Sequence, residues 1–237
     1  MPNQGDNVKT VKRAITVFFL LDKSGSMAGE RIAKLNQAIP VTIDALHSVQ
    51  DDNPNLRIVV KVMEFSDSVS LSTGENAQEL DNFNWRDLEA DGRTATASAI
   101  NLLCDHLDIE RMPKRGYPPV AVLVSDGYCT ESDDRYNAAI DRLNNDPWGK
   151  RAARIVVSIG DDIDEEALRR FVNANGSYIN CLDAADIVEY IRTKTTEATL
   201  SNSESRPVEE AKDDDGGEDA QSDNAANSSA VNPDELF

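Results

Sequence analysis

The sequence of 237 residues has few of the side chains that hold soft metals or form disulfides. It contains three cysteines and two histidines, His47 and His106, with no CxxC pair and no His/Cys cluster. Zinc and copper centres are built mainly from those two residue types. The composition therefore disfavours a soft-metal site and a disulfide framework, and it favours reduced thiols in a cytoplasmic protein.

Long hydrophobic runs are also missing. The apolar run at 14–21 is eight residues long, follows Lys9, Lys12 and Arg13, and ends at Asp22. A helix needs about 20 apolar residues to cross a bilayer. No A-x-A-like cleavage site follows the run, which argues against a signal peptide. We therefore expect a buried strand here and no membrane association.

Basic residues are scarce, with 24 Lys and Arg against 43 Asp and Glu and a net charge of −19. The charge is −10 over residues 197–237 and −9 over residues 1–196. A nucleic-acid partner would require clustered basic side chains, so we expect none. Cations or basic protein patches are the favoured partners.

The last part of the chain, 196–237, has almost no large apolar residues before its final VNPDELF. Such a composition cannot bury enough surface to offset its ordering entropy, so we predict a disordered acidic tail. The final segment is either a short docking peptide or an apolar chain end of no significance. Residues 1–13 are expected to form a polar arm, which leaves 14–195 as the folded domain.

Within 14–195, apolar strand patterns alternate with helical ones. The expected strands lie at 14–21, 57–65, 118–125, 153–160 and 177–180, with an antiparallel return arm after 66–68. The expected helices lie at 29–49, 95–108, 132–145, after Asp164, and at 184–195. Pro40 should kink or break the first of these helices. This order predicts an α/β fold: one doubly wound, mostly parallel sheet with one antiparallel edge strand and helices on both faces.

Oxygen-bearing side chains follow the predicted strands at the edge where such a sheet binds ligands. Asp22, Ser24 and Ser26 follow the first strand, and Asp126 follows the strand at 118–125. Thr94 precedes the helix at 95–108. Carboxylates and hydroxyls are hard ligands, so the inventory suits Mg²⁺, with Mn²⁺ or Ca²⁺ as alternatives.

Three segments carry a resemblance to a known family. "DKSGSM", "DGRTATASAI" and "LVSDG" resemble, in order and spacing, the three loops of von Willebrand factor A (vWA) domains, and the resemblance covers about 14–195. Among these domains the chain looks most like the compact bacterial vWA proteins of the tellurium-resistance type. Proteins of that type are cytoplasmic partners of kinase and phosphatase proteins.

The resemblance implies a metal-ion-dependent adhesion site (MIDAS). Its metal ligands would be Asp22, Ser24, Ser26, Thr94 and Asp126. Thr96 competes with Thr94 for the second-loop position. The family's second loop usually begins Gly-Gly, whereas this chain has Gly92-Arg93, which places a cation beside the metal.

The mechanism implied is recognition, in which an acidic side chain of a partner protein completes the metal shell. Partner contacts are expected from Arg93, Gly25 and Gly127. No turnover is expected. A metal-assisted, phosphatase-like hydrolase using the same Asp and Ser residues is the alternative. Both histidines lie late in their predicted helices, and the sequence contains neither a G-x-S-x-G elbow nor a Gly-rich phosphate loop.

Overall fold

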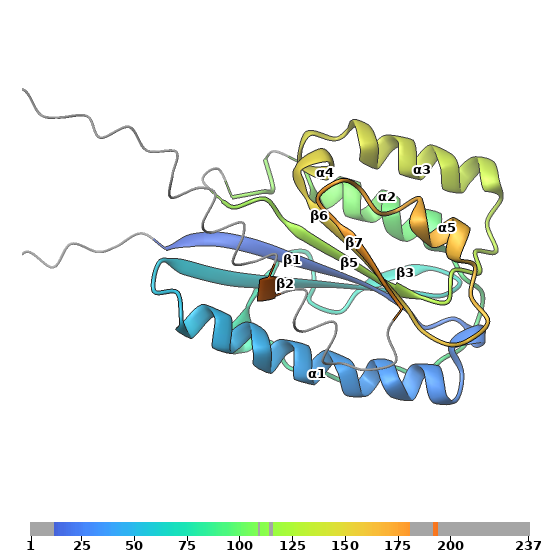
Figure 1. Ribbon diagram of the computed structural model, residues 1–237, viewed down its shortest axis with the longest axis horizontal. Coiled ribbons are helices and arrows are strands. Elements are labelled where there is room, and N and C mark those ends of the chain that lie inside the picture. Colours follow the sequence, from blue (N-terminus) through green and yellow to red (C-terminus); the bar gives the residue numbers. More distant parts are fainter. Residues whose placement is uncertain (1–11, 109, 114–115, 181–191, 194–237) are drawn as a thin grey trace, which may run out of the picture. The chain divides into compact units, whose positions relative to one another are not determined.

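The computed structural model describes residues 12–108, 110–113, 116–180 and 192–193. Within them a mostly parallel sheet is covered by helices on both faces (Figure 1). The predicted fold class is therefore confirmed. The predicted acidic tail, nearly all of the N-terminal arm and most of the predicted helix at 184–195 lie outside the described residues.

The sheet has the order β3-β2-β1-β5-β6-β7, with β4 also paired to β2. β1, β2, β5, β6 and β7 are parallel, and β3 and β4 run antiparallel to β2. The strands span β1 Arg13–Asp22, β2 Leu56–Phe65, β3 Val69–Leu71, β4 Gln78–Glu79, β5 Val120–Ser125, β6 Ala153–Ser158 and β7 Ser177–Asn180. β3 is the predicted return arm. β4 was not predicted, because its two residues are too few to show a strand pattern.

β1 lies at the centre of the sheet, and its apolar run is explained by burial on both faces. Phe19 and Leu21 belong to the core on the α1 side, and Phe18 and Leu20 belong to the core on the α2 and α3 side. All four are at most 1% exposed. Alternate side chains of a strand point to opposite faces, so a strand covered on both sides must be apolar throughout.

The helices lie in two layers, with α1 on one face and α2, α3 and α5 on the other (Figure 1). The helices span α1 Glu30–Asp51, α2 Thr96–His106, α3 Asp133–Asn145, α4 Pro147–Arg151 and α5 Glu165–Arg169, with short 3-10 turns η1 Gly25–Met27 and η2 Leu80–Asn82. None of the described helices is long and apolar enough to cross a membrane.

Pro40 does not break α1, which continues through it for 22 residues. Of the two predicted outcomes, a kink or a break, the break does not occur. The helix packs its buried stripe, which includes Leu35, Ile39, Ile43 and Leu46, against the sheet. This tertiary burial outweighs the hydrogen bond that proline cannot donate.

An aspartate side chain caps the N-terminus of α4 and of α5. Asp164 accepts a hydrogen bond from the Ala167 N–H at 3.0 Å, which confirms its role as the cap of α5. α4 was not predicted, although Asp146 followed by Pro147 is a helix-start signal. The Asp146 side chain accepts from the Gly149 N–H at 2.6 Å.

Candidate metal centre

The three loops that carry the motifs meet at the edge of the sheet where β1 and β5 end. The Gly25 N–H donates to the Gly92 carbonyl at 2.9 Å, which joins the first loop to the second. The Thr130 N–H donates to the Thr94 carbonyl at 3.0 Å, which joins the second loop to the third. Backbone hydrogen bonds thus fix the relative position of all three loops.

Asp22, the last residue of β1, is fully buried, and the protein satisfies both of its carboxylate oxygens. Oδ1 accepts from the Ser24 N–H at 2.8 Å, and Oδ2 accepts from the Ser125 hydroxyl at 2.6 Å. Burial raises the pKa of Asp22 to about 6, against the lowering effect of these hydrogen bonds, and the charge of Asp126 raises it further. Ser125 was not identified from the sequence, although it is the serine of the "LVSDG" segment.

The hydroxyls of Ser24 and Ser26 are hydrogen-bonded to each other, with 3.0 Å between the two oxygens. Ser24 is buried, whereas Ser26 is exposed, so the pair extends from the protein interior towards solvent. Met27, the residue after Ser26, is fully buried in the core on the α1 side. That burial holds η1, and hence both serines, against the sheet.

Thr94 and Thr96, the two candidates from the second loop, are each 3% exposed. In the part of the chain that the structure describes, the Thr94 hydroxyl makes no hydrogen bond, and its backbone N–H and carbonyl pair with Thr130. The Thr96 hydroxyl is also buried without a partner among those residues. Each side chain thus retains an unused oxygen, and the structure leaves both assignments open.

Asp126, in the third loop, is fully buried and is paired with an arginine that the sequence analysis missed. The Arg31 guanidinium, from the first turn of α1, places Nη1 2.8 Å from Asp126 Oδ2. Asp126 Oδ1 accepts from the Tyr128 N–H at 3.2 Å. Arg31 lies 95 residues from Asp126, so only the tertiary fold reveals the pair.

The predicted partner contacts lie at this edge, and the structure gives the glycines backbone roles there. A side chain at Gly25 would approach the Gly92 carbonyl to 3.2 Å, and one at Gly127 would lie 2.5 Å from the Asp164 carbonyl. Arg93 is exposed, and its backbone N–H donates to Asp67 at 3.0 Å. Partner contact by these three residues stays a prediction.

The donor set fits a hard divalent cation. Ligands at about 2.1 Å in neighbouring corners of an octahedron lie about 3.0 Å apart, which is the separation of the two serine oxygens. No group of three or more His, Cys, Asp or Glu side chains suited to a metal occurs among the described residues. Any cation held here would therefore depend on hydroxyls, carbonyls or water for part of its shell.

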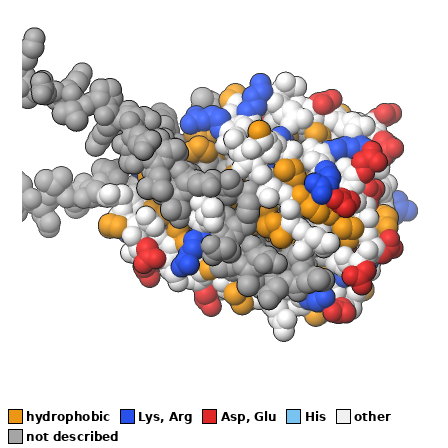
Figure 2. All heavy atoms as spheres, in the orientation of Figure 1, with side chains coloured by type: hydrophobic (Ala, Val, Ile, Leu, Met, Phe, Trp, Pro, Cys, Tyr) orange, Lys and Arg blue, Asp and Glu red, His pale blue; other side chains and the backbone are white. Residues whose placement is uncertain are grey.

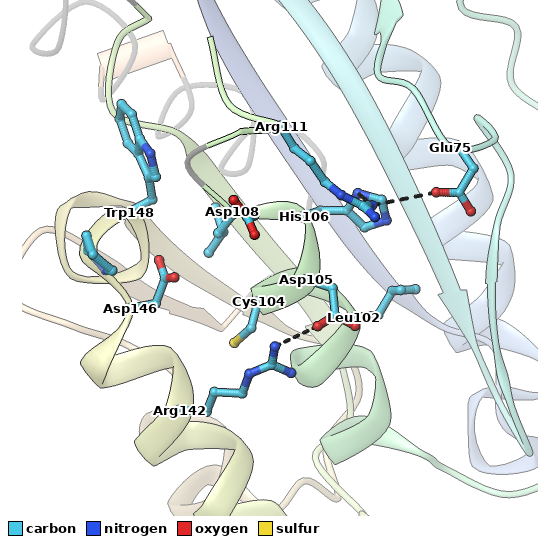
Figure 3. Close-up of a pocket in the computed structure, with 12 residues that line it drawn as sticks. Glu75, Leu102, Cys104, Asp105, His106, Asp108, Arg111, Arg142, Asp146 and Trp148 are labelled. Carbon is cyan, nitrogen blue, oxygen red and sulfur yellow. Dashed lines mark hydrogen bonds and ion pairs between the residues drawn. The ribbon is translucent and has the colours of Figure 1, made fainter. Parts of the chain in front are cut away.

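Neither histidine is near this edge. His106 is the last residue of α2, about 16 Å along the helix axis from the second loop. It lines a separate pocket with Arg111, Arg142 and Trp148, at the far end of α2 (Figure 3). His47 is about 25 Å along α1 from its first residue. No histidine base can therefore activate Ser24 or Ser26.

Comparison with known proteins agrees with this geometry. A family model described as the von Willebrand factor type A domain matches residues 16–193. The chain belongs to the vWA family. The match covers the sheet from β1 to β7 and contains all three loops of the candidate vWA metal centre. No curated protein matches the chain.

Several solved structures share the vWA fold with this chain. A von Willebrand factor type A protein from Catenulispora acidiphila is 19% identical, with a TM-score of 0.57, over 79% of this chain and 43% of that one. An aerotolerance-related membrane protein from Bacteroides fragilis is 16% identical, with a TM-score of 0.56, over 77% of this chain and 99% of that one. The PilB minor pilin from Streptococcus sanguinis is 14% identical, with a TM-score of 0.59, over 87% of this chain and 65% of that one. This chain therefore spans less than half of the first structure's length. At these identities the likeness establishes the fold alone.

Proposed function

We propose that this vWA domain is a metal-dependent protein-interaction module. A divalent cation, Mg²⁺ or alternatively Mn²⁺ or Ca²⁺, binds at the ends of β1 and β5. An Asp or Glu side chain of a partner protein completes its shell. The observation that carries the proposal is the pair of serine oxygens 3.0 Å apart, beside two fully buried carboxylates.

Each residue of the site has a distinct part in this proposal. Ser24, Ser26 and Thr94 offer neutral oxygens, and Asp22 and Asp126 supply negative charge. The cation, when bound, supplies the positive charge that attracts a carboxylate. Because Ser26 is exposed, the partner approaches from its side of the loop. Binding requires no bond to break, so we expect no turnover.

The surface around the site favours cations over anions. Acidic side chains gather along the edge where the parallel strands end (Figure 2). They include Asp133 and Asp134 in the first turn of α3. Glu165 and Glu166 in the first turn of α5 pair with Arg169 and Arg170, so they contribute less. Such a field attracts divalent ions and repels a partner carboxylate until a cation is bound. The acidic edge thereby supports a requirement for metal in partner binding.

We also propose a biological setting for this interaction module. The resemblance of the motifs to tellurium-resistance-type proteins favours a cytoplasmic protein of a bacterial stress or signalling system. In such a system a kinase or phosphatase would be the partner.

Replacing Thr94 with Val should weaken Mg²⁺ binding at least tenfold with little loss of stability. The substitution removes a hydroxyl that makes no hydrogen bond to the described residues, so an unbound protein loses little. Isothermal titration of Mg²⁺ and Mn²⁺ measures the affinity, and thermal melting in EDTA measures the stability.

Thr96→Val is the matched control, because it removes a buried hydroxyl that has no partner among the described residues, two residues from Thr94. It should leave the metal affinity unchanged. Loss of metal binding in Thr96→Val but not in Thr94→Val would identify Thr96 as the second-loop ligand. Unchanged binding in both variants would contradict a second-loop hydroxyl ligand.

Partner binding should require the metal. We expect a partner that co-purifies in Mg²⁺ to be lost in EDTA and to be lost from Ser26→Ala in either buffer. Pull-down of the full chain from its native cells, with mass spectrometry, measures this. A partner retained equally in EDTA and by Ser26→Ala would place its binding site elsewhere on the domain.

A further inference from the structure

The Arg31 side chain places a positive charge at the candidate metal centre, in addition to that of any bound divalent cation. Besides its 2.8 Å contact with Asp126, Nη1 lies 3.0 Å from the Ser26 carbonyl oxygen. Nη2 lies 3.0 Å from the carbonyl oxygen of Asp162, in the loop after β6. One guanidinium thus joins α1 to the first loop, the third loop and the loop that leads into α5.

The loop after β6 packs closely against the Arg31 guanidinium. Gly160 has a φ of +106°, and a β-carbon there would overlap the Arg31 side chain. A residue with a side chain at position 160 is therefore disfavoured by the backbone conformation and would displace the Arg31 guanidinium. Asp162 is held in turn by a 2.6 Å hydrogen bond from the Tyr128 hydroxyl to its carboxylate. These contacts fix the acceptors that hold Arg31 over Asp126.

Both oxygens of Asp126 are already engaged by the protein, one by the Tyr128 N–H and one by Arg31. A divalent cation on Oδ2 must share that oxygen with the guanidinium or replace it, and a cation on Oδ1 would still lie a few ångströms from the guanidinium. Sharing would place two positive charges a few ångströms apart around a carboxylate that has no exposed surface. The two charges repel at that separation, and the Arg31 side chain, which is 23% exposed, can move towards solvent, so replacement is favoured.

We propose that Arg31 and the divalent cation compete for Asp126. Arg31 therefore raises the metal concentration at which the site fills. Filling the site in turn releases the bridge from α1 to the loop at 159–164. The inference rests on the proposed metal-binding function. Coupling between two binding events is reciprocal. The free energy by which Arg31 weakens metal binding therefore equals the free energy by which bound metal weakens the contacts of Arg31.

Isothermal titration of Mg²⁺ into the full chain tests the competition. Arg31→Gln should bind Mg²⁺ at least fivefold more tightly than the wild type, within the usual range of coupling between sites. Arg31→Lys keeps the charge but not the forked geometry, and it should lie between the two. Arg31→Lys also serves if Arg31→Gln fails to fold.

Lys34→Gln is the matched control, because it removes the same charge from the same helix one turn away, where Lys34 pairs with Glu30 at 2.8 Å. It should change the Mg²⁺ affinity less than twofold. Hydrogen exchange of the amides at 160–163 gives a second readout. In the wild type, Mg²⁺ should speed their exchange towards the rate of metal-free Arg31→Gln.

The outcomes separate this inference from the proposed function. Mg²⁺ binding by the wild type and Arg31→Gln with equal affinity, or weaker binding by the variant, overturns the competition and leaves the metal centre standing. Equal tightening in Arg31→Gln and Lys34→Gln overturns it as well, because net charge alone would then explain the effect. Absence of binding in every variant overturns both proposals.

Discussion

Asp22→Asn should abolish stabilisation by Mg²⁺ while making the metal-free protein more stable. The Asp22 carboxylate is fully buried, and its pKa rises from 3.8 to about 6 because burial disfavours the charged form. That rise corresponds to about 3 kcal/mol of unfavourable free energy above pH 6. Asn is uncharged and of similar shape, so it removes this cost. Its oxygen can still accept from the Ser24 N–H, and its NH2 group can donate to the Ser125 hydroxyl oxygen, so only one of the two original hydrogen bonds is lost. The substitution also removes a charge that the proposed site needs.

The pH dependence of this gain has a definite sign. Between pH 3.8 and about 6 the unfolded chain has released the Asp22 proton while the folded protein retains it, so stability contributed by this group falls as pH rises. The advantage of Asp22→Asn over the wild type should therefore grow across that window and then level off. Urea denaturation in EDTA at pH 4, 5, 6 and 7.5 measures it.

Asp22→Ala provides the control for this experiment. It removes the charge but also the acceptors for the Ser24 N–H and the Ser125 hydroxyl, which are both buried. Unpaired buried donors cost about 1–3 kcal/mol each, so Asp22→Ala should be less stable than Asp22→Asn. An Asp22→Asn protein that is less stable than the wild type in EDTA at pH 7.5 would contradict the expected cost of the buried charge.

Gly127→Ala should destabilise the domain by about 2–5 kcal/mol. Gly127 has a φ of +90°, where a residue with a β-carbon costs about 1–2 kcal/mol. The added β-carbon would also lie 2.5 Å from the Asp164 carbonyl oxygen and 2.9 Å from Leu168 Cγ. Such overpacking costs about 1–3 kcal/mol more. Urea denaturation measures the sum.

Gly29→Ala isolates the backbone part of that cost. Gly29 has a φ of +80°, and a β-carbon there would meet no atom within 4 Å. Its ψ of −124° lies outside the left-handed helical region, in a conformation that only glycine adopts readily, so we expect Gly29→Ala to lose about 1–3 kcal/mol. A Gly127→Ala protein that loses no more than Gly29→Ala would show that the third loop and the start of α5 can move apart freely.

The central strands were predictable because burial on both faces leaves a continuous apolar run. β1, β2 and β5 begin and end within two residues of their predicted limits. β4 was not predictable, since two residues carry no periodicity. α4 was missed because five residues do not show a helical stripe, although Asp146 and Pro147 gave a local signal.

The candidate site was predictable only where its residues occur in motifs. Asp22, Ser24 and Ser26 are two residues apart in one loop, and their convergence follows from chain geometry. Ser125 and Arg31 contribute through contacts 103 and 95 residues away in sequence. Serine before a loop aspartate and arginine on a helix are both common, so composition and spacing could not single them out.

The pairing of β1 with β5 also determines when the site can form. Leu21 lies opposite Val124 in the parallel register, so Asp22 can reach the Ser125 hydroxyl only after β5 has docked beside β1. An N-terminal fragment that ends before residue 120 carries four of the five proposed ligands but cannot assemble them. During synthesis, a cation could therefore bind stably only after roughly the first half of the chain has emerged and these distant strands have paired, which is a slow class of folding step.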